Sequence, residues 1–463
     1  MRVFVFGAGL SGLSAASRLC EGKVPVTVFE SADRVGGMAS SFTEDGFTYD
    51  LGPHRFHSSD KTLMSHMKEL LSDSTEDKVR KSRILLEGRF FDYPLKVGNA
   101  VFNMPPLTTL RIMFDYVVIK LKNLFARAPD NNFENWVVNR FGWKLYDIYF
   151  RVYTEKTWGI PCTSLSADWA AQRITLLGLW DTLVKTLYKR GDAPRTYVST
   201  FLYPSSGGIG RICEAYAKKV KDSGSDIRCG SKVEQVKVSD GKITEFNAGG
   251  ANVPVTEEDI VFSTIPLTDF VRSITPSAPK DVLEACERLK FRSIVFVYLM
   301  LEKNSLSDDH WIYLPQQMFT SNRLSESRNF NASNAPAGKT VVGFEITCQM
   351  NDDVWNASKE DLTRWAVEDV VRSGLAKKED VVGSAIHYMP HAYPIYDLGY
   401  RENLDKVLNY LKTLSNLRFF GRNGLFRYNN MDHSVGMGLF VADSITDKNI
   451  NYMQVATENH WFG

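Results

Sequence analysis

A glycine-rich turn near the start of the chain constrains the fold more than any other feature. The apolar run Val3–Phe6 leads directly into Gly7-Ala8-Gly9-Leu10-Ser11-Gly12, and small and apolar residues at helical spacing follow. A second apolar run, Val24–Phe29, ends at Glu30. Strand, glycine turn, helix, strand and acid in this order are typical of the βαβ unit that binds a dinucleotide. We therefore predict that the chain opens with a parallel, Rossmann-type α/β unit.

The spacing of the glycines and the acid indicates what this unit would hold. Gly7 permits the tight turn, Gly9 lets the backbone approach a pyrophosphate, and Gly12 lets helix and strand pack closely. The helix N-terminus would face the phosphates, and Glu30 stands where an acid bonds a ribose hydroxyl. An ordinary βα turn is the alternative, but the four surrounding elements favour a dinucleotide, either NAD or FAD. Neighbouring residues expected at the same site are Leu10, Ser11 and Ser31.

Further turns combine glycine with polar groups. Gly36-Gly37-Met38 follows the second strand, so a phosphate or ribose contact is expected there rather than a plain loop. The turn Gly52–His57 follows a predicted strand and contains two histidines and an arginine. Near the other end of the chain, residues 417–424 are typical of one more strand that ends in a glycine turn.

Charge balance and cysteine spacing limit the classes of function. The 463 residues include 55 Lys and Arg against 54 Asp and Glu, so nothing general favours nucleic acid or an anionic membrane. Six cysteines lie scattered without a C-x-x-C pair, which indicates reduced thiols in a cytoplasmic protein rather than disulfides or a zinc site. The first apolar run enters the glycine turn directly, so we expect no signal peptide.

The segment Leu107–Phe125 is the most lipid-like part of the chain. Arg111, Asp115, Lys120 and Lys122 interrupt it, so it is not expected to span a bilayer. We predict an amphipathic helix that faces a core. Contact with a membrane surface is the less favoured alternative.

Changes in periodicity predict an α/β protein with interleaved domains. A Rossmann-type dinucleotide-binding domain is expected from residues 1–94, 196–270 and 417–463, with a helical insert at 95–195. Residues 271–416 are expected to form a second, mainly antiparallel β-sheet domain. Within these ranges we predict a hairpin at 84–94, helices at 212–221, 360–372 and 437–445, and strands at 294–301 and 339–348. Strands at 227–238 and 260–265 are expected to rejoin the first sheet.

Protein side chains alone indicate neither a hydrolase nor a metalloenzyme. The sequence has no nucleophile elbow in a Ser-His-Asp order, no H-E-x-x-H and no Walker lysine. His54 with His57, and His387 with His391, are better explained by packing or hydrogen bonding than by a metal. We therefore expect no metal site and a cofactor that carries the difficult chemistry.

Four segments together resemble the UDP-galactopyranose mutases, and the eukaryotic branch is the closer match. They are the N-terminal fingerprint with Gly36-Gly37, the turn Gly52-Pro53-His54, the segment Phe150–Trp158, and Gly421–Tyr428 continued through Asp432-His433-Ser434. The fingerprint is also similar to that of the wider superfamily of flavin amine oxidases, protoporphyrinogen oxidases and phytoene desaturases. The resemblance covers nearly the whole chain.

The resemblance implies FAD as the cofactor. The N-terminal glycines and Glu30 would hold its adenosine and pyrophosphate half, and Val233 would contact adenine through its backbone. His54 would lie on the flavin side, and Arg422 and the helix start near Ser434 would approach the isoalloxazine ring. The implied cofactor contacts are Gly7, Gly9, Leu10, Ser11, Gly12, Glu30, Ser31, Gly36, Gly37, Met38, Gly52, His54, Val233, Gly421, Arg422, Asp432, His433 and Ser434.

The same resemblance implies that arginines clamp a substrate diphosphate. Arg151 falls on one clamp position and Arg323 on the other, and two guanidinium groups suit a diphosphate. Tyr393 and Tyr428 match family tyrosines that line the substrate pocket. With His54, these four are the implied catalytic residues. A structural salt bridge is the alternative for each arginine.

The chain departs from the family around this clamp. Asn322 stands where the family has a tyrosine just before the second arginine, and Phe330 replaces a tyrosine that contacts the diphosphate. In the segment that packs on uridine, Leu95-Lys96 replaces an aromatic–amide pair. These changes keep the charges and alter the hydrogen bonds, so they bear on the identity of the sugar nucleotide more than on the flavin.

Three functions remain open at this point. The first is a mutase that interconverts pyranose and furanose forms of a nucleotide sugar through an adduct with flavin N5, as in cell-surface polysaccharide synthesis. The second is an FAD-dependent oxidoreductase of the amine oxidase, protoporphyrinogen oxidase or desaturase type, and the third is a non-catalytic FAD-binding module. A mutase needs reduced FAD, with NADPH or NADH as candidate electron donors. Either enzyme would act on a small molecule, and the oligomeric state stays open.

Overall fold

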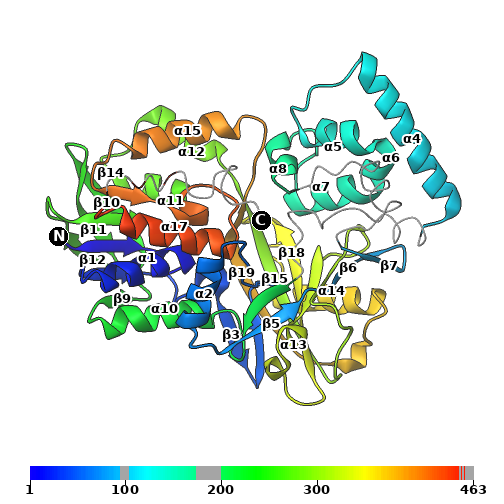
Figure 1. Cartoon of the computed structure of the whole chain (residues 1–463), viewed down its shortest axis with the longest axis horizontal. Helices are drawn as coiled ribbons and strands as arrows, with labels where there is room; N and C mark the ends of the chain where they lie inside the picture. The colour runs from blue at the N-terminus through cyan, green and yellow to red at the C-terminus, as the bar shows by residue number, and fades with distance from the viewer. Residues whose placement is uncertain (94–103, 174–199, 448–449, 451–452, 454–463) are drawn as a thin grey trace.

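A parallel sheet joins strands from distant parts of the sequence. In the computed structural model, which describes residues 1–93, 104–173, 200–447, 450 and 453, the strand order is β20-β13-β1-β2-β9 (Figure 1). These strands are β1 (Val3–Phe6), β2 (Val26–Phe29), β9 (Asp226–Arg228), β13 (Ile260–Ser263) and β20 (Leu417–Phe419). All four neighbouring pairs are parallel, which confirms the predicted Rossmann-type sheet.

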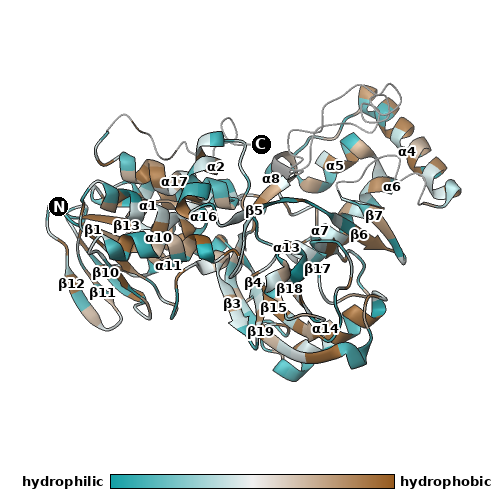
Figure 2. Ribbon diagram, turned by 60° about the horizontal axis from the view of Figure 1, so that its bottom comes forward, coloured by the Kyte–Doolittle hydropathy of each residue, from teal (hydrophilic) through white to brown (hydrophobic). Residues whose placement is uncertain are grey.

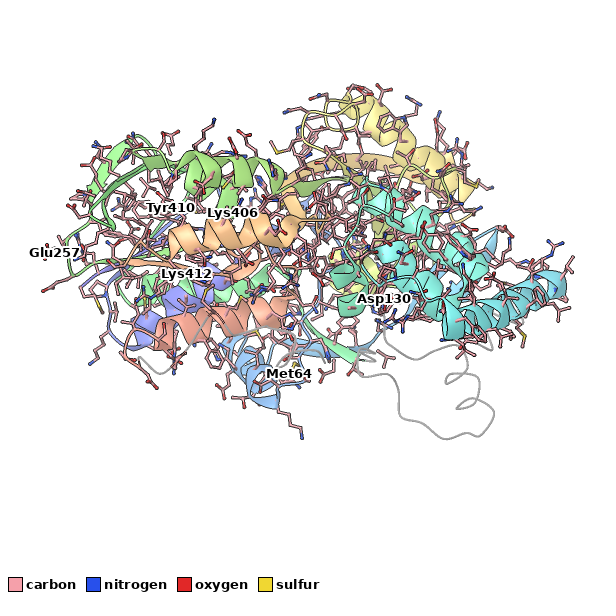
Figure 3. All side chains as sticks on the ribbon, turned by 90° about the horizontal axis from the view of Figure 1, so that it is seen from above. Met64, Asp130, Glu257, Lys406, Tyr410 and Lys412 are labelled. Atoms are coloured by element: carbon pink, nitrogen blue, oxygen red, sulfur yellow. The ribbon has the colours of Figure 1, made fainter. Side chains whose placement is uncertain are left out.

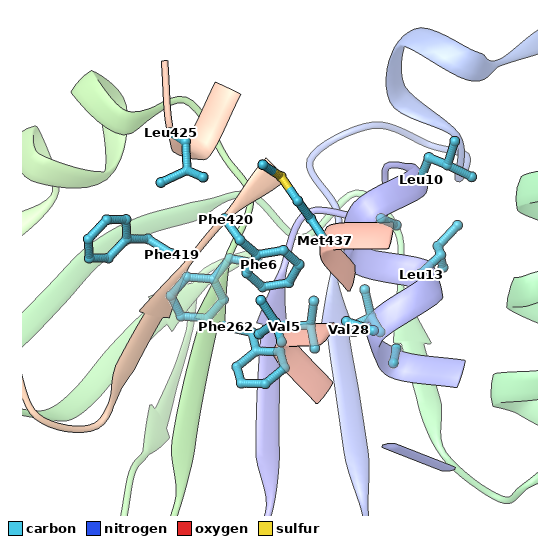
Figure 4. Close-up of a cluster of buried hydrophobic side chains, with 14 of the residues drawn as sticks. Val5, Phe6, Leu10, Leu13, Val28, Phe262, Phe419, Phe420, Leu425 and Met437 are labelled. Carbon is cyan, nitrogen blue, oxygen red and sulfur yellow. The ribbon is translucent and has the colours of Figure 1, made fainter. Parts of the chain in front are cut away.

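Helices and a second sheet bury this parallel sheet. Helix α1 (Leu10–Glu21) packs against both α10 (Arg211–Asp222) and α17 (Met431–Asp443). Phe6 and Phe262 are fully buried in the cluster shown in Figure 4. Phe246 reaches the same core from the second sheet, with its ring centroid 4.8 Å from that of Phe6. The continuous apolar strands therefore have cover on both faces, as a parallel sheet requires.

The second sheet corrects one strand prediction. It has four strands in the order β12 (Ala251–Pro254), β11 (Lys242–Ala248), β10 (Val233–Ser239) and β14 (Ile274–Thr275). The predicted strand at 227–238 is in fact two strands, because the chain turns between β9 and β10 at Gly230, whose φ is +66°. Only β9 joins the parallel sheet, whereas β10 belongs to the four-stranded one.

The third sheet is mainly antiparallel and confirms the predicted second domain type. Its order is β19 (Val381–Pro394), β15 (Phe291–Leu301), β18 (Thr340–Cys348), β17 (Arg323–Glu326), β16 (Trp311–Tyr313), β6 (Ser82–Leu86) and β7 (Arg89–Asp92). Helix α14 (Lys359–Arg372) packs on it. The predicted hairpin at 84–94 is β6–β7, and it pairs with this sheet rather than with the parallel one. Figure 2 shows the part that contains the parallel sheet beside the part that contains the third sheet. The helical region lies on the other side of the third sheet.

The helical insert lies between residues 104 and 173 of the described chain. It comprises α4 (Pro106–Phe125), α5 (Phe133–Phe141), α6 (Trp143–Leu145), the π-helix η2 (Tyr146–Arg151), α7 (Val152–Trp158) and α8 (Ala167–Arg173). Gly142, with φ at +85°, separates α5 from α6. Leu95 and Lys96, which replace the family's uridine-packing pair, lie outside the described residues.

Helix α4 corrects the prediction that this segment faces a core. Only Ile112 and Ile119 among its large apolar side chains are buried. The others are 42–90% exposed, and together they are named here the outer face of α4: Leu107, Leu110, Met113, Phe114, Val117, Val118, Leu121, Leu124 and Phe125. The helix thus attaches to the protein through its narrower side and presents its broad apolar side outward.

The remaining helices and strands complete the fold. They are η1 (Gly37–Ala39), β3 (Ser41–Glu44), β4 (Phe47–Asp50), α2 (Lys61–Leu70), β5 (Thr75–Val79), β8 (Thr200–Pro204), α11 (Leu267–Arg272), α12 (Lys280–Arg288), α13 (Ser327–Phe330), η3 (Ala332–Asn334), η4 (Lys378–Asp380), α15 (Tyr400–Leu411) and α16 (Gly421–Gly424). Helix α17 begins at Met431, six residues before the predicted 437, because Asn430 and His433 form a capping box.

Candidate cofactor and substrate site

The glycine fingerprint has the geometry that a pyrophosphate site needs. Gly7 has φ at +100°, and a Cβ on Gly12 would lie 2.0 Å from the carbonyl oxygen of Gly7, so only glycine fits at position 12. A Cβ on Gly9 would meet nothing within 4 Å, because this residue faces open space. Gly9 is also the N-cap of α1 and offers no capping side chain. The first N–H groups of α1 are therefore available to an anion.

Glu30 lies beside this turn as the sequence predicts. One carboxylate oxygen accepts from Ala8 N at 2.8 Å, and the other accepts from Ala32 N at 2.9 Å and Ser31 Oγ at 3.1 Å. Each carboxylate oxygen can accept more than one hydrogen bond, so the buried group keeps capacity for a ribose hydroxyl. Ser231 N donates to Glu30 O at 2.7 Å, which brings the chain leading to Val233 to the same side.

One cavity of about 400 Å³ joins the ends of several elements around this turn. It gathers residues from the N-terminal fingerprint, from the Gly52–His57 turn, from the third sheet and from the start of α17. Seventeen predicted site residues line it: Gly7, Gly9, Leu10, Ser11, Glu30, Ser31, Gly36, Gly37, Met38, Gly52, His54, Arg323, Tyr393, Gly421, Arg422, Tyr428 and Ser434. Residues more than 400 positions apart in the sequence thus meet at one site.

Five predicted residues do not line the cavity: Gly12, Arg151, Val233, Asp432 and His433. Gly12 serves helix–strand packing, as described above. Asp432 and His433 lie in the first turn of α17, beside Met431 and Ser434, which do line the cavity. Asp432 Oδ1 is buried and has no hydrogen-bond partner within the protein. A hydroxyl-bearing ligand such as the ribityl chain of a flavin would satisfy it.

Arg151 also lies outside the cavity. It ends η2, and its Nε lies 3.0 Å from Asp147 Oδ1 in an i,i+4 ion pair. Both side chains are nearly half exposed. The predicted clamp of Arg151 and Arg323 is therefore not assembled here, because the helical spacing offers Arg151 a local carboxylate.

His54 lies partly buried among positive charges. Burial first, and then Arg422, Arg323 and Arg55, lower the pKa of His54 to about 3. Its Nδ1 is buried without a hydrogen-bond partner in the protein. The imidazole is therefore neutral at physiological pH.

Two stacked tyrosines and an arginine form one wall of the cavity. The Tyr393 and Tyr428 ring centroids are 5.5 Å apart with an interplanar angle of 10°. Arg422 lies over Tyr428, with its guanidinium carbon 4.2 Å from the ring centroid. The guanidinium donates to the carbonyl oxygens of Ala392 and Asn429, at 2.7 Å and 2.6 Å, which fixes its orientation. Burial first, and then Tyr428, raise the pKa of Tyr393, so its hydroxyl remains a donor.

Arg323 already has a carboxylate partner. Strands β17 and β18 place Arg323 opposite Glu345, and the guanidinium makes two hydrogen bonds of 2.8 Å to the carboxylate. Burial disfavours the charge, but Glu345 outweighs it and leaves the pKa of Arg323 above its ordinary value. Both residues line the cavity, so this pair sits where a substrate anion was expected.

Sequence reasoning missed several residues of the cavity. Glu345 sits inside an apolar strand, and nothing in its neighbourhood marks it as functional. Arg55 and His57 also line the cavity, although the sequence predicts no ligand-binding role for either of them. Their position directly after His54 was the available signal.

The residues present fit a flavin dinucleotide. The α1 N-terminus with Gly9 suits the pyrophosphate, and Glu30 suits the adenosine ribose. The unpartnered Asp432 Oδ1 and His54 Nδ1 offer acceptor or donor positions toward the other half. Within the described residues, no group of three or more acidic, histidine or cysteine side chains could hold a metal ion. The same part of the chain contains no helix with the length and apolarity to cross a membrane.

Two known proteins are similar to this chain in sequence. The phytoene desaturase (neurosporene-forming) of Rhodobacter capsulatus is 26% identical over 274 residues, 52% of this chain and 48% of the relative. The 4,4'-diapophytoene desaturase of Staphylococcus aureus is 24% identical over 305 residues, 60% of this chain and 57% of the relative. The chain thus spans about half the length of the curated relatives it matches.

Solved structures share the fold over nearly the whole length. A reduced UDP-galactopyranose mutase superposes with a TM-score of 0.85 at 22% identity, covering 98% of this chain and 97% of that one. A putrescine oxidase bound to putrescine gives a TM-score of 0.66 at 17% identity, covering 96% and 98%. At these identities the likeness concerns the fold alone. The family model of the flavin containing amine oxidoreductases matches residues 10–391, and by that match over most of its length the chain belongs to this family.

Proposed function

We propose that this flavoprotein is an FAD-dependent nucleotide-sugar mutase that interconverts pyranose and furanose forms. The observation that carries the proposal is the cluster of guanidinium groups around His54. Arg55, Arg323 and Arg422 line the same cavity, and their positive charges all act on the His54 ring. Such a cluster favours an anionic substrate, and a nucleoside diphosphate is the anion that a sugar nucleotide carries.

Each group in the cavity has a role in this proposal. Bound FAD would supply the electron-rich ring on which the rearrangement depends. The arginines would hold the diphosphate and neutralise it as it leaves the anomeric carbon. The stacked pair Tyr393 and Tyr428 would orient the sugar and donate hydrogen bonds. Trp158 and Trp169 pack against these rings in edge-to-face geometry and would help to exclude water.

Product analysis tests this function. The purified protein, reduced with dithionite, should convert UDP-galactopyranose or a related nucleotide sugar to its furanose form, and the oxidised protein should not. Arg323→Met should lose this activity, whereas Arg211→Met should keep it, because Arg211 is exposed, pairs with Glu214 and lies outside the cavity. Anaerobic mixing with NADPH or NADH would identify the electron donor by bleaching of the flavin.

A flavin oxidoreductase is the second candidate. The observation that favours it is the Arg323–Glu345 pair, which lowers the positive charge available to a diphosphate. Phe330 also favours it, because this residue is buried beside Tyr203 and Trp311 and offers no hydroxyl. In this case no nucleotide sugar should perturb the flavin spectrum, while an amine, a porphyrinogen or a polyene should bleach it. That outcome would overturn the mutase proposal.

A further inference from the structure

Arg55 is a partly buried arginine without a counter-ion in the described protein. It follows His54 in the turn after β4 and lines the cavity. Its Nε is buried and makes no hydrogen bond, and no carboxylate of the described residues forms an ion pair with it. Its guanidinium carbon lies 4.5 Å from the centroid of the Trp311 ring. An aromatic face stabilises the cation but does not occupy its N–H donors.

Four other arginines of the region, buried or partly buried, have partners for their donors. Arg323 pairs with Glu345, and Arg83 pairs with Asp309, with Nη2 2.6 Å from Oδ2. Arg292 and Arg422 donate to backbone carbonyl oxygens. A buried cation without such partners is costly, so proteins keep one chiefly where a ligand supplies the missing charge.

The charges around Arg55 also favour a bound anion. Burial first, and then Arg80, lower the pKa of Arg55 to about 10, with a further lowering by Arg323. Two like charges thus act on a group that itself lacks a carboxylate. A bound anion at this place would offset the repulsion between these cations.

We propose that Arg55 binds a phosphate group of the substrate, and so takes the place in the clamp that Arg151 does not fill. This inference rests on the proposed function for the position of the ligand. It names a residue that the resemblance does not, because the sequence argument placed the clamp on Arg151 and Arg323.

Binding of inorganic pyrophosphate and of UDP to the FAD-loaded protein tests the proposal. Calorimetry should show that Arg55→Met lowers the affinity for both ligands by at least about tenfold, since a charge-assisted hydrogen bond is lost. Arg55→Lys should recover part of the affinity, and Arg211→Met is the control for the loss of one positive charge. Acetate should bind far more weakly than pyrophosphate to the unaltered protein, because a single negative charge offsets less of the repulsion between the cations.

Two outcomes would overturn the assignment. Unchanged pyrophosphate affinity in Arg55→Met would show that Arg55 does not contact the anion. Loss of flavin from Arg55→Met and Arg55→Lys, read from the ratio of flavin to protein absorbance, would assign the arginine to the cofactor instead. Neither result depends on whether furanose forms, so failure of this inference and failure of the mutase proposal are distinguishable.

A second and independent inference concerns the outer face of α4, at the edge of the molecule (Figure 1). Its apolar residues repeat at three- and four-residue steps along the helix. The opposite side attaches α4 to the protein through Ile112 and Ile119 and through Asp115, which accepts from Lys144 N at 2.9 Å. A soluble helix usually shows the reverse arrangement, with its apolar stripe inside.

The charges beside this face are all positive. At 100° per residue, Arg111 and Lys122 flank the outer face on one side and Lys120 flanks it on the other, and all three are exposed. Asp115 is the only acid in the helix and points inward. An apolar stripe bordered by exposed cations is typical of a helix that lies in the interface of an anionic bilayer.

We infer that the outer face of α4 docks on an anionic lipid surface. Charge complementarity selects this occupant: a second copy of the same face would bring the same cations together across a two-fold axis. A lipid surface instead buries the apolar side chains and supplies negative headgroups to the flanking residues.

Sedimentation with vesicles tests this inference. The full chain should bind vesicles of equal parts phosphatidylcholine and phosphatidylserine, and bind phosphatidylcholine alone much less. Lys120→Glu with Lys122→Glu should weaken binding at least about tenfold. Lys406→Glu with Lys412→Glu is the matched control, because these lysines lie in the half of the molecule away from the helical region (Figure 3).

Substitution of the apolar face separates lipid from protein. Leu110→Ser, Phe114→Ser and Leu121→Ser combined should abolish vesicle binding while the chain stays monodisperse. No binding to either vesicle at low salt would overturn the inference. So would a stable oligomer that dissociates in the triple variant, since the occupant would then be a second copy.

Discussion

The buried Arg323–Glu345 pair gives a prediction in two measurable parts. The guanidinium makes two hydrogen bonds of 2.8 Å to a carboxylate that is only 5% exposed. Glu345→Gln removes the negative charge and leaves Arg323 without its counter-ion. Breaking a buried pair costs roughly 3–5 kcal/mol, and the lower end applies because the Arg323 side chain is 20% exposed. Unfolding in guanidinium chloride should therefore show that the substitution lowers the free energy of unfolding by about 3 kcal/mol.

The same substitution should improve anion binding. Glu345 and a ligand phosphate compete for the same guanidinium, so removal of the carboxylate frees donors worth about 1.5–3 kcal/mol each. Calorimetry should then show pyrophosphate bound about tenfold more tightly by Glu345→Gln than by the unaltered protein. The variant should thus lose stability and gain affinity, whereas nonspecific disruption of the fold would lower both.

The Arg83–Asp309 pair is a matched control. Its Nη2–Oδ2 distance is 2.6 Å and the Asp309 side chain is fully buried, but neither residue lines the cavity. Asp309→Asn should therefore destabilise the protein to a similar degree and leave pyrophosphate affinity unchanged. The reasoning is refuted if Glu345→Gln leaves both stability and affinity unchanged, or if both pairs alter affinity equally.

Other predictions follow from single contacts. Gly12→Ala should lower both stability and FAD content, because the new Cβ would lie 2.0 Å from the carbonyl oxygen of Gly7, whereas Gly9→Ala should lower FAD content only. Thermal melts with flavin absorbance would separate the two. The folded pKa of His54, about 3, lies below its ordinary 6.5, so His54 contributes stability that is lost as pH falls below 6.5. The melting temperature should therefore fall less steeply between pH 7 and pH 4 in His54→Gln than in the unaltered protein. Arg151→Ala should change pyrophosphate affinity by less than about twofold, and a tenfold loss would return Arg151 to the clamp.

Features encoded over short stretches of sequence could be predicted well. The βαβ unit with Gly9 and Glu30 was predicted correctly because its glycines, apolar runs and acid lie within thirty residues. Strands β15 and β18 were likewise clear from continuous apolar residues with high β-propensity. Local patterns were less reliable where a turn interrupts them, as between β9 and β10.

The outward orientation of α4 could not be predicted from its periodicity. The pattern shows that the helix has a broad apolar side, but a helix period does not say which side meets the protein. That depends on which neighbours pack against it, and here Ile112 and Ile119 make the contact. Of the four charged residues that interrupt this segment, Arg111, Lys120 and Lys122 flank the exposed side, whereas Asp115 points inward.

By itself the sequence determined a Rossmann-type α/β unit with its glycine turn and Glu30, because backbone turns and strand order are encoded locally. Only the tertiary structure decided how the charged groups in and around the cavity pair. It set Glu345 against Arg323 through the register of β17 and β18, gave Arg151 a local partner, and left Arg55 without one. Ion pairing in a buried cavity depends on which side chains meet across elements distant in sequence, and no local pattern carries that information.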